Sequence, residues 1–371
     1  MTRRFATLLA ATLVAAPFAQ TNARQQLERG KALWDQRLAN SAIAALEAAV
    51  KDPATAAEAH EALGRLYTFK GWLADNVYPG WHDEPLLREK ALAELRAAVA
   101  ADPGRASAKE ALQAAEGYAA ADSVDPAPLR PEIRALDQKL QSAASVDEIL
   151  AAVDARAKAQ ADPAPYFTGA QMLIDKGAYA QAIDLANRGA AASDRFINEN
   201  LSAYQLTGKS QGSFARGRAT AADLVGWALF SQKDYAKARE RLEEAARLSQ
   251  DQDLVNQFHL GELARAQGDT ARARNYYLNA LALSGGPPPL RQRVTQALTA
   301  LEAGDAAAAG GFDAWLDSEL ARRREERKAT ALKSLVDRPL PKLTLTTVDG
   351  RPYNTAGLQG KVLLLNFFAS W

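Results

Sequence analysis

Two short segments of the sequence hold residue types that could do chemistry. Gly208 to Gly212 reads G-x-S-x-G, the pattern of a nucleophile elbow whose serine attacks an acyl group. His82-Asp83-Glu84 places three side chains that can ligate a metal next to one another. The chain has two further histidines, His60 and His259, which could act as a base or a ligand.

Neither segment has the surroundings that its chemistry needs. An elbow requires a strand before the serine and a helix after it, whereas the sequence around Ser210 is typical of helical repeats. Adjacent residues point in different directions, so His82-Asp83-Glu84 is a poor ligand set. Trp72, Tyr78 and Trp81 could form an aromatic binding patch, but we expect them to cap the repeat groove. We therefore expect no catalytic, cofactor-binding or metal-binding residue in the chain.

Composition narrows the possible functions further. The 371 residues include no cysteine, so the chain has no thiolate nucleophile, disulfide or cysteine-based metal site. Basic and acidic residues number 45 and 44, and this balance gives no electrostatic reason to expect nucleic acid as a partner.

The first 23 residues have the pattern of a secretory signal peptide. Arg3 and Arg4 precede an apolar stretch from Phe5 to Ala16, and Ala19 or Ala23 could lie just before a cleavage site. The apolar stretch is too short to span a bilayer. We expect the mature protein to be exported to the periplasm or the extracellular space, without stable insertion in a membrane.

Residues 24–303 repeat a spacing of small and bulky apolar residues. Leu260-Gly261, Ala264, Ala273 and Tyr277 recur about 35 residues earlier as Val225-Gly226, Leu229, Ala238 and Leu242. Weaker copies lie around Gly30, Gly64 and Ala170. This period resembles the tetratricopeptide repeat, a pair of antiparallel helices that stacks on its neighbours and presents a surface to a protein or peptide. The Pro-rich segment Asp122 to Pro131 divides the array into two blocks, residues 24–121 and 122–303.

Two segments follow the repeats. Residues 304–338 have the spacing of a flexible stretch and a connector helix, which starts at Phe312. From 339 to 371 the order is strand, Asp349-Gly350 turn, returning strand and a buried strand from Val362 to Phe368. The last residues, Lys361 to Trp371, resemble the segment that precedes the C-x-x-C motif in the TlpA-like redoxin family of extracytoplasmic thiol-disulfide oxidoreductases.

This resemblance implies a fold and an activity. The expected fold class is mainly α, with a tetratricopeptide-like solenoid followed by the first strands of a truncated thioredoxin-like α/β domain. A complete domain would exchange disulfides or reduce peroxides while the repeats bind a protein partner, but the chain as it stands lacks the nucleophile. The alternative is a non-catalytic repeat scaffold. A UGA codon for selenocysteine after Trp371, a nonsense mutation and an incomplete sequence would each explain the missing motif.

Overall fold

A computed structural model describes residues 22–73, 87–117, 130–201, 210–283, 287–302, 311–333, 344–346 and 352–354. The chain divides into two compact units, one ending at Val294 and the other running from Thr295 to Ser370. The predicted signal peptide and the His82-Asp83-Glu84 segment lie outside the described residues.

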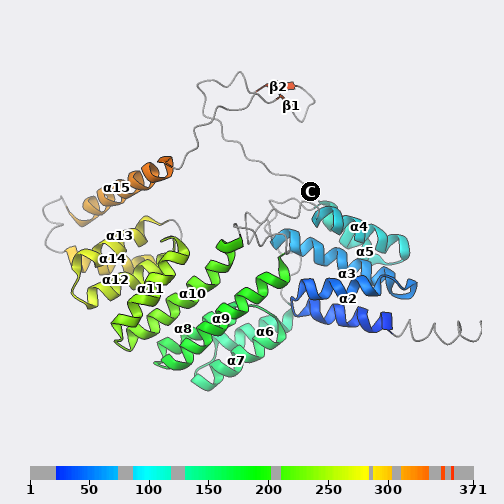
Figure 1. Cartoon of the computed structure of the whole chain (residues 1–371), viewed down its shortest axis with the longest axis horizontal. Helices are drawn as coiled ribbons and strands as arrows, with labels where there is room; N and C mark the ends of the chain where they lie inside the picture. Colours follow the sequence, from blue (N-terminus) through cyan, green and yellow to red (C-terminus); the bar gives the residue numbers. More distant parts are fainter. Residues whose placement is uncertain are drawn as a thin grey trace, which may run out of the picture. The chain divides into compact units, whose positions relative to one another are not determined.

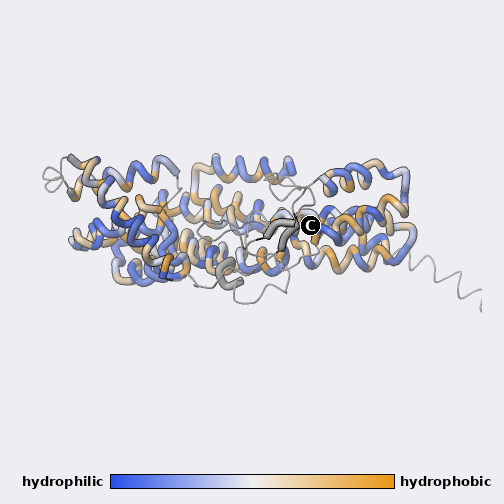
Figure 2. Tube along the Cα trace, turned by 90° about the horizontal axis from the view of Figure 1, so that it is seen from above, coloured by the Kyte–Doolittle hydropathy of each residue, from blue (hydrophilic) through white to orange (hydrophobic). Residues whose placement is uncertain are grey.

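The first unit is built from helices that pack on their neighbours in sequence (Figure 1). It begins with a helix over residues 22–35. The following helices are α2 Ala39–Ala49, α3 Pro53–Trp72, α4 Leu87–Ala101, α5 Ala106–Gly117, α6 Pro131–Gln141, α7 Val146–Ala159, α8 Ala164–Asp175, α9 Tyr179–Asn200, α10 Ser210–Ser231, α11 Tyr235–Ser249, α12 Leu254–Ala266, α13 Thr270–Ala282 and the first half of α14 Pro288–Glu302. Apolar and polar residues alternate along these helices, as expected for helices with one buried face (Figure 2).

Glycines set the distance between the two helices of a repeat. A Cβ atom added at Gly226 would lie 2.7 Å from Leu242, and one added at Gly261 would lie 2.4 Å from Tyr277. Gly30 and Gly64 face Leu46 and Leu95 in the same way. The glycines of the repeated spacing therefore lie where the two helices of a repeat approach closely.

Side-chain caps fix where several helices begin. Ser145 and Glu148 form a capping box at the start of α7, and Asp52 and Asp253 accept hydrogen bonds from the first amides of α3 and α12. Such caps satisfy backbone donors that have no partner within the helix. They place the short turns of the array at defined residues.

Polar contacts join the two predicted repeat blocks. Nδ2 of Asn40 donates to the carbonyls of Asn198 and Leu201 at 2.8 and 3.1 Å, and Nδ2 of Asn200 donates to the carbonyl of Arg37 at 2.9 Å. An apolar cluster accompanies them, formed by the buried residues Phe69, Leu73, Ile197 and Leu201. The first unit therefore continues from one block into the next.

The second unit contains the rest of α14, α15 (Phe312–Lys333) and two short strands. Helix α15 covers the segment in which the sequence predicts a helix starting at Phe312. Strands β1 (Thr344–Thr346) and β2 (Pro352–Asn354) pair antiparallel, with Leu345 opposite Tyr353.

The expected thioredoxin-like half of the fold class is wrong. Across the described ranges, the sheet consists of these two three-residue strands, and helices make up the other regular structure. An α/β domain needs a multi-stranded sheet covered by helices, and a two-stranded hairpin has too little surface to form such a core. The helical-repeat half of the expectation is compatible with the structure. The buried strand expected from Val362 to Phe368 lies outside the described residues.

Candidate peptide-binding groove

A groove of about 1240 Å³ lies beside the turn between α11 and α12. Its walls come from the first part of α10, from the α11–α12 turn and from the residues that follow α13. The lining residues are Phe214, Ala215, Arg216, Arg218, Ala219, Thr220, Arg247, Leu248, Ser249, Gln250, Gln252, Asp253, Leu254, Val255, Leu283 and Pro287.

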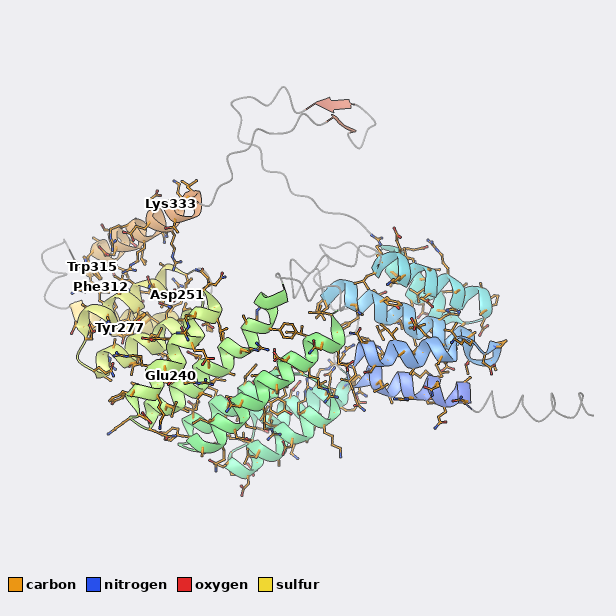
Figure 3. The ribbon with its side chains drawn as sticks, viewed as in Figure 1. Glu240, Asp251, Tyr277, Phe312, Trp315 and Lys333 are labelled. Carbon is orange, nitrogen blue, oxygen red and sulfur yellow. The ribbon has the colours of Figure 1, made fainter. Side chains whose placement is uncertain are left out.

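The α11–α12 turn has an unusual backbone. Gln250 and Asp251 both have positive φ, at 53° and 57°, although neither is glycine. The amide of Asp251 donates to the carbonyl of Ala246 at 2.9 Å, and Nε2 of Gln257 donates to Oδ1 of Asp251 at 3.2 Å. Left-handed backbone is costly for such residues and persists where surrounding contacts hold it. These bonds hold the backbone at Asp251, between the lining residues Gln250 and Gln252; Asp251 is labelled in Figure 3.

The carboxylate of Asp253 caps α12 at the groove wall. Its Oδ1 accepts hydrogen bonds from the amides of Val255 and Asn256 at 2.8 and 3.3 Å. Burial, together with the neighbouring carboxylate of Asp223, raises the pKa of Asp253 above its ordinary value. Asp253 therefore binds its proton more tightly than an exposed aspartate.

A buried polar network ties α10 to α12. Asp223 accepts a hydrogen bond from Nδ2 of Asn256 at 2.9 Å through Oδ1, while its Oδ2 lies 2.9 Å from Nδ1 of His259. The imidazole stacks on Trp227, with ring centroids 4.1 Å apart and planes inclined by 10°. Asp223 and His259 are each 5% exposed. A general base must reach its substrate, so this pair serves packing rather than catalysis.

Arg218 and Arg247, which both line the groove, differ in whether they form an ion pair. Arg218 donates to Oδ2 of Asp194 at 2.9 Å, and its guanidinium lies 5.8 Å from the centre of the Phe214 ring. Arg247 is exposed in the last turn of α11. Among the described residues, no carboxylate lies within salt-bridge distance of Arg247.

The structure places the sequence candidates apart from one another. Ser210 is the first residue of α10, and the described helix before it, α9, ends at Asn200, whereas Gly208 and Lys209 of the G-x-S-x-G pattern lie outside the described residues. Nδ1 of His60 lies 2.6 Å from Oε2 of Glu94 on α4, far along the chain from the groove. The ranges that the structure describes hold no group of three histidine or acidic side chains arranged to bind a metal ion.

Sequence reasoning missed the groove and the network beneath it. The sequence did hold a signal for the network. Asp223 and His259 are 36 residues apart, and the repeat period places two such positions on the first helices of adjacent repeats. The left-handed turn at Gln250 and Asp251 gave little signal, since glycine, asparagine and aspartate are the residues that usually adopt left-handed backbone and Gln250 is none of these.

No protein-family model matches the chain, and a search of curated proteins found no significant match. Among the helices of the described segments, none has the length and apolar character needed to cross a membrane.

Proposed function

We propose that this protein is a non-catalytic binding protein whose helical repeats hold an extended segment of a partner protein. The observation that carries the proposal is the groove between α10 and the α11–α12 turn. Its volume of about 1240 Å³ exceeds the roughly 300–1,000 Å³ of sites that take small molecules. Stacked repeats also present surfaces that suit extended ligands.

The composition of the groove supports a peptide over a purely apolar ligand. Val255 is 37% exposed at the groove although it is a large apolar residue. Hydroxyl and amide groups of Thr220, Ser249 and Gln252 lie on the same walls. A peptide can satisfy both kinds of surface, because its side chains and its backbone differ in polarity.

Selection from a phage-displayed library of random peptides tests this function. We expect enriched peptides to slow hydrogen exchange of the amides in residues 214–220 and 247–255. Val255→Trp fills part of the groove and should weaken these peptides at least about tenfold, a loss of about 1.4 kcal/mol. Leu332→Trp is the matched control, since Leu332 is an exposed apolar residue on α15 and is not among the residues that line the groove. Failure to enrich any peptide, or equal binding by the wild type and Val255→Trp, would disprove the function.

Two expectations from the sequence stay predictions. The first is thiol-disulfide exchange, which the resemblance of residues 339–371 implies. It needs a nucleophile that this sequence lacks. Export is tested by fractionating cells of the host and determining the N-terminus of the mature chain, which we expect after Ala19 or Ala23.

A further inference from the structure

The charges around the groove are unbalanced. Arg216, Arg218 and Arg247 line it together with one carboxylate, that of Asp253, while Asp194 pairs with Arg218 without lining the groove. Asp253 points its Oδ1 at the first amides of α12, which offset part of its negative charge. Arg218 is paired with Asp194 and Arg216 also has an interaction of its own, so the excess of positive charge in the groove is that of Arg247.

Arg247 contributes most directly to this excess. It is exposed in the final turn of α11, and within the described part of the chain it forms no ion pair. A cation in the last turn of a helix interacts favourably with the helix dipole. This accounts for a positive charge at residue 247 but not for the choice of arginine. A guanidinium has five donors in a planar fork that matches a carboxylate.

Apolar surface lies between the charged groups. Val255 is 37% exposed on the first turn of α12, and Phe214 is half-buried at the start of the opposite wall. Leu254 and Leu283 are almost completely buried at the groove, where they give it an apolar base. A ligand that fits has both carboxylates and apolar side chains.

We infer that the groove binds an acidic, extended segment of a partner protein, in which acidic residues alternate with apolar ones. The inference rests on the peptide-binding function proposed above. In an extended chain, alternate side chains point to opposite sides, so one side can face Arg247 while the other contacts Val255 and Phe214. Charge complementarity selects such a segment over a basic one.

Single-stranded nucleic acid is the competing anionic ligand, and the groove favours it less. Proteins that bind single strands stack successive bases on several aromatic rings. Of the described residues that line this groove, only Phe214 is aromatic. The near balance of 45 basic and 44 acidic residues also gives the chain no general attraction for phosphates.

Fluorescence anisotropy with two labelled twelve-residue peptides tests the inference. One peptide alternates glutamate with leucine, and the other has glutamine in place of every glutamate. The full chain should bind the glutamate peptide at least about tenfold more tightly at low salt, and the difference should shrink as ionic strength rises because salt screens exposed charges.

Two substitutions should move this affinity in opposite directions. Arg247→Gln should weaken the glutamate peptide about tenfold and leave the glutamine peptide unchanged. Asp253→Asn keeps a good helix cap and removes a negative charge, so it should tighten binding of the glutamate peptide alone. Arg134→Gln is the matched control, because Arg134 is exposed on α6 away from the groove. Circular dichroism of each variant checks that the fold is retained.

The outcomes separate this inference from the function on which it rests. Equal affinity for the two peptides, or no binding of either, would overturn the acidic preference, while library-selected peptides that still respond to Val255→Trp would leave the binding function standing. An oligothymidylate that displaces the glutamate peptide and binds more tightly in an Arg247-dependent way would overturn the inference in favour of nucleic acid. Dimerisation that the glutamate peptide reverses and Arg247→Gln abolishes would overturn it in favour of a second copy of the chain.

Discussion

Nδ1 of His259 lies 2.9 Å from Oδ2 of Asp223, and this buried contact joins the first helices of two adjacent repeats. Asn256 strengthens the junction, because its Nδ2 donates both to Asp223 and to the carbonyl of Leu242 on the helix between them. The network lies on the helices that form two walls of the groove. It therefore fixes the spacing of the surface that we propose binds a partner.

Removing the carboxylate at this junction should destabilise the protein strongly. Asp223→Ala leaves His259 and Asn256 without their shared acceptor, so we expect a loss of about 2–4 kcal/mol in the free energy of unfolding, measured with urea. Asp184→Ala is the control, since Asp184 is 66% exposed in its pair with Arg188 and should cost less than about 1 kcal/mol. Similar losses in the two variants would show that the buried network is not needed for stability.

A glycine of the repeat should be intolerant of even one added methyl group. At Gly226 a Cβ atom would lie 2.7 Å from the Leu242 side chain and 3.1 Å from its backbone nitrogen, so α10 and α11 would have to separate. We expect Gly226→Ala to cost about 1–3 kcal/mol, seen as a lower midpoint of thermal unfolding.

Gly71 provides the comparison for that substitution. A Cβ atom there would meet its nearest neighbour, Leu87, at 3.9 Å, which is ordinary contact. Alanine is the better helix former, so Gly71→Ala should leave stability unchanged or raise it by up to about 1 kcal/mol. If both alanine variants were equally stable, close helix approach at Gly226 would not be a requirement of the repeat.

Helix pairing could be predicted from the sequence because it follows from local spacing. The repeated spacing places Gly226 and Gly261 where the two helices of a repeat approach each other. In the structure these glycines face Leu242 and Tyr277. The groove could not be predicted, because it depends on left-handed backbone at two consecutive residues, Gln250 and Asp251, and glutamine gives no sign of such a conformation. The expected thioredoxin-like α/β domain is wrong for a different reason, although the strand and returning strand predicted around Asp349-Gly350 are present as β1 and β2. Residues 339–371 resemble part of a domain, but the described part of this segment has only a hairpin with Leu345 opposite Tyr353.

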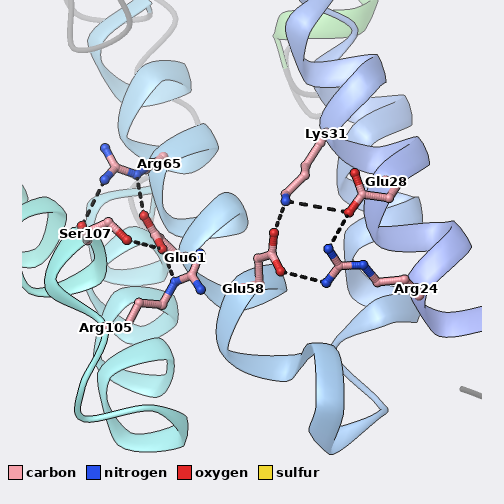
Figure 4. A network of polar contacts seen from close by, with 8 residues as sticks. All are labelled: Arg24, Glu28, Lys31, Glu58, Glu61, Arg65, Arg105 and Ser107. Atoms are coloured by element: carbon pink, nitrogen blue, oxygen red, sulfur yellow. Dashed lines mark hydrogen bonds and ion pairs between the residues drawn. The ribbon is translucent and has the colours of Figure 1, made fainter.

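Glu61 should make the stability of the N-terminal repeats depend on acid pH. Burial opposes its ionisation, but hydrogen bonds from Arg105, Ser107 and Arg65 outweigh that effect and lower the pKa of Glu61 (Figure 4). Because the folded-state pKa is below the unfolded value of 4.5, the ionised group stabilises the fold above that pH, and this contribution is lost as pH falls through the folded pKa.

Glu61→Gln measures that contribution. At pH 7 the variant should be about 1–3 kcal/mol less stable than the wild type, and the difference should shrink as urea unfolding is repeated below pH 4.5. Glu110→Gln changes an exposed glutamate on α5 and should follow the wild type at every pH. A Glu61→Gln deficit that stays constant down to pH 3 would mean that lost packing, rather than charge, causes it.

The last prediction concerns the junction between the two repeat blocks. Asn200 is completely buried, and its Nδ2 donates to the carbonyls of Arg37 and Phe196, each at 2.9 Å. Asn200→Ala removes the bond to Arg37, which belongs to the first block, and leaves that carbonyl without this donor. Since each repeat is stabilised by its neighbours, the helices next to the junction should open more often, while distant repeats keep their protection.

Hydrogen exchange measured along the chain tests this localisation. In Asn200→Ala the amides of α2 and of the last turns of α9 should exchange about tenfold faster or more, whereas those of α12 and α13 should not change. Asn198→Ala is the matched control, because Asn198 is exposed and contributes its backbone carbonyl, which alanine retains, to the bond from Asn40. Faster exchange spread evenly over α2 to α13 would mean that the array opens as one cooperative unit and that the junction is not a separate point of weakness.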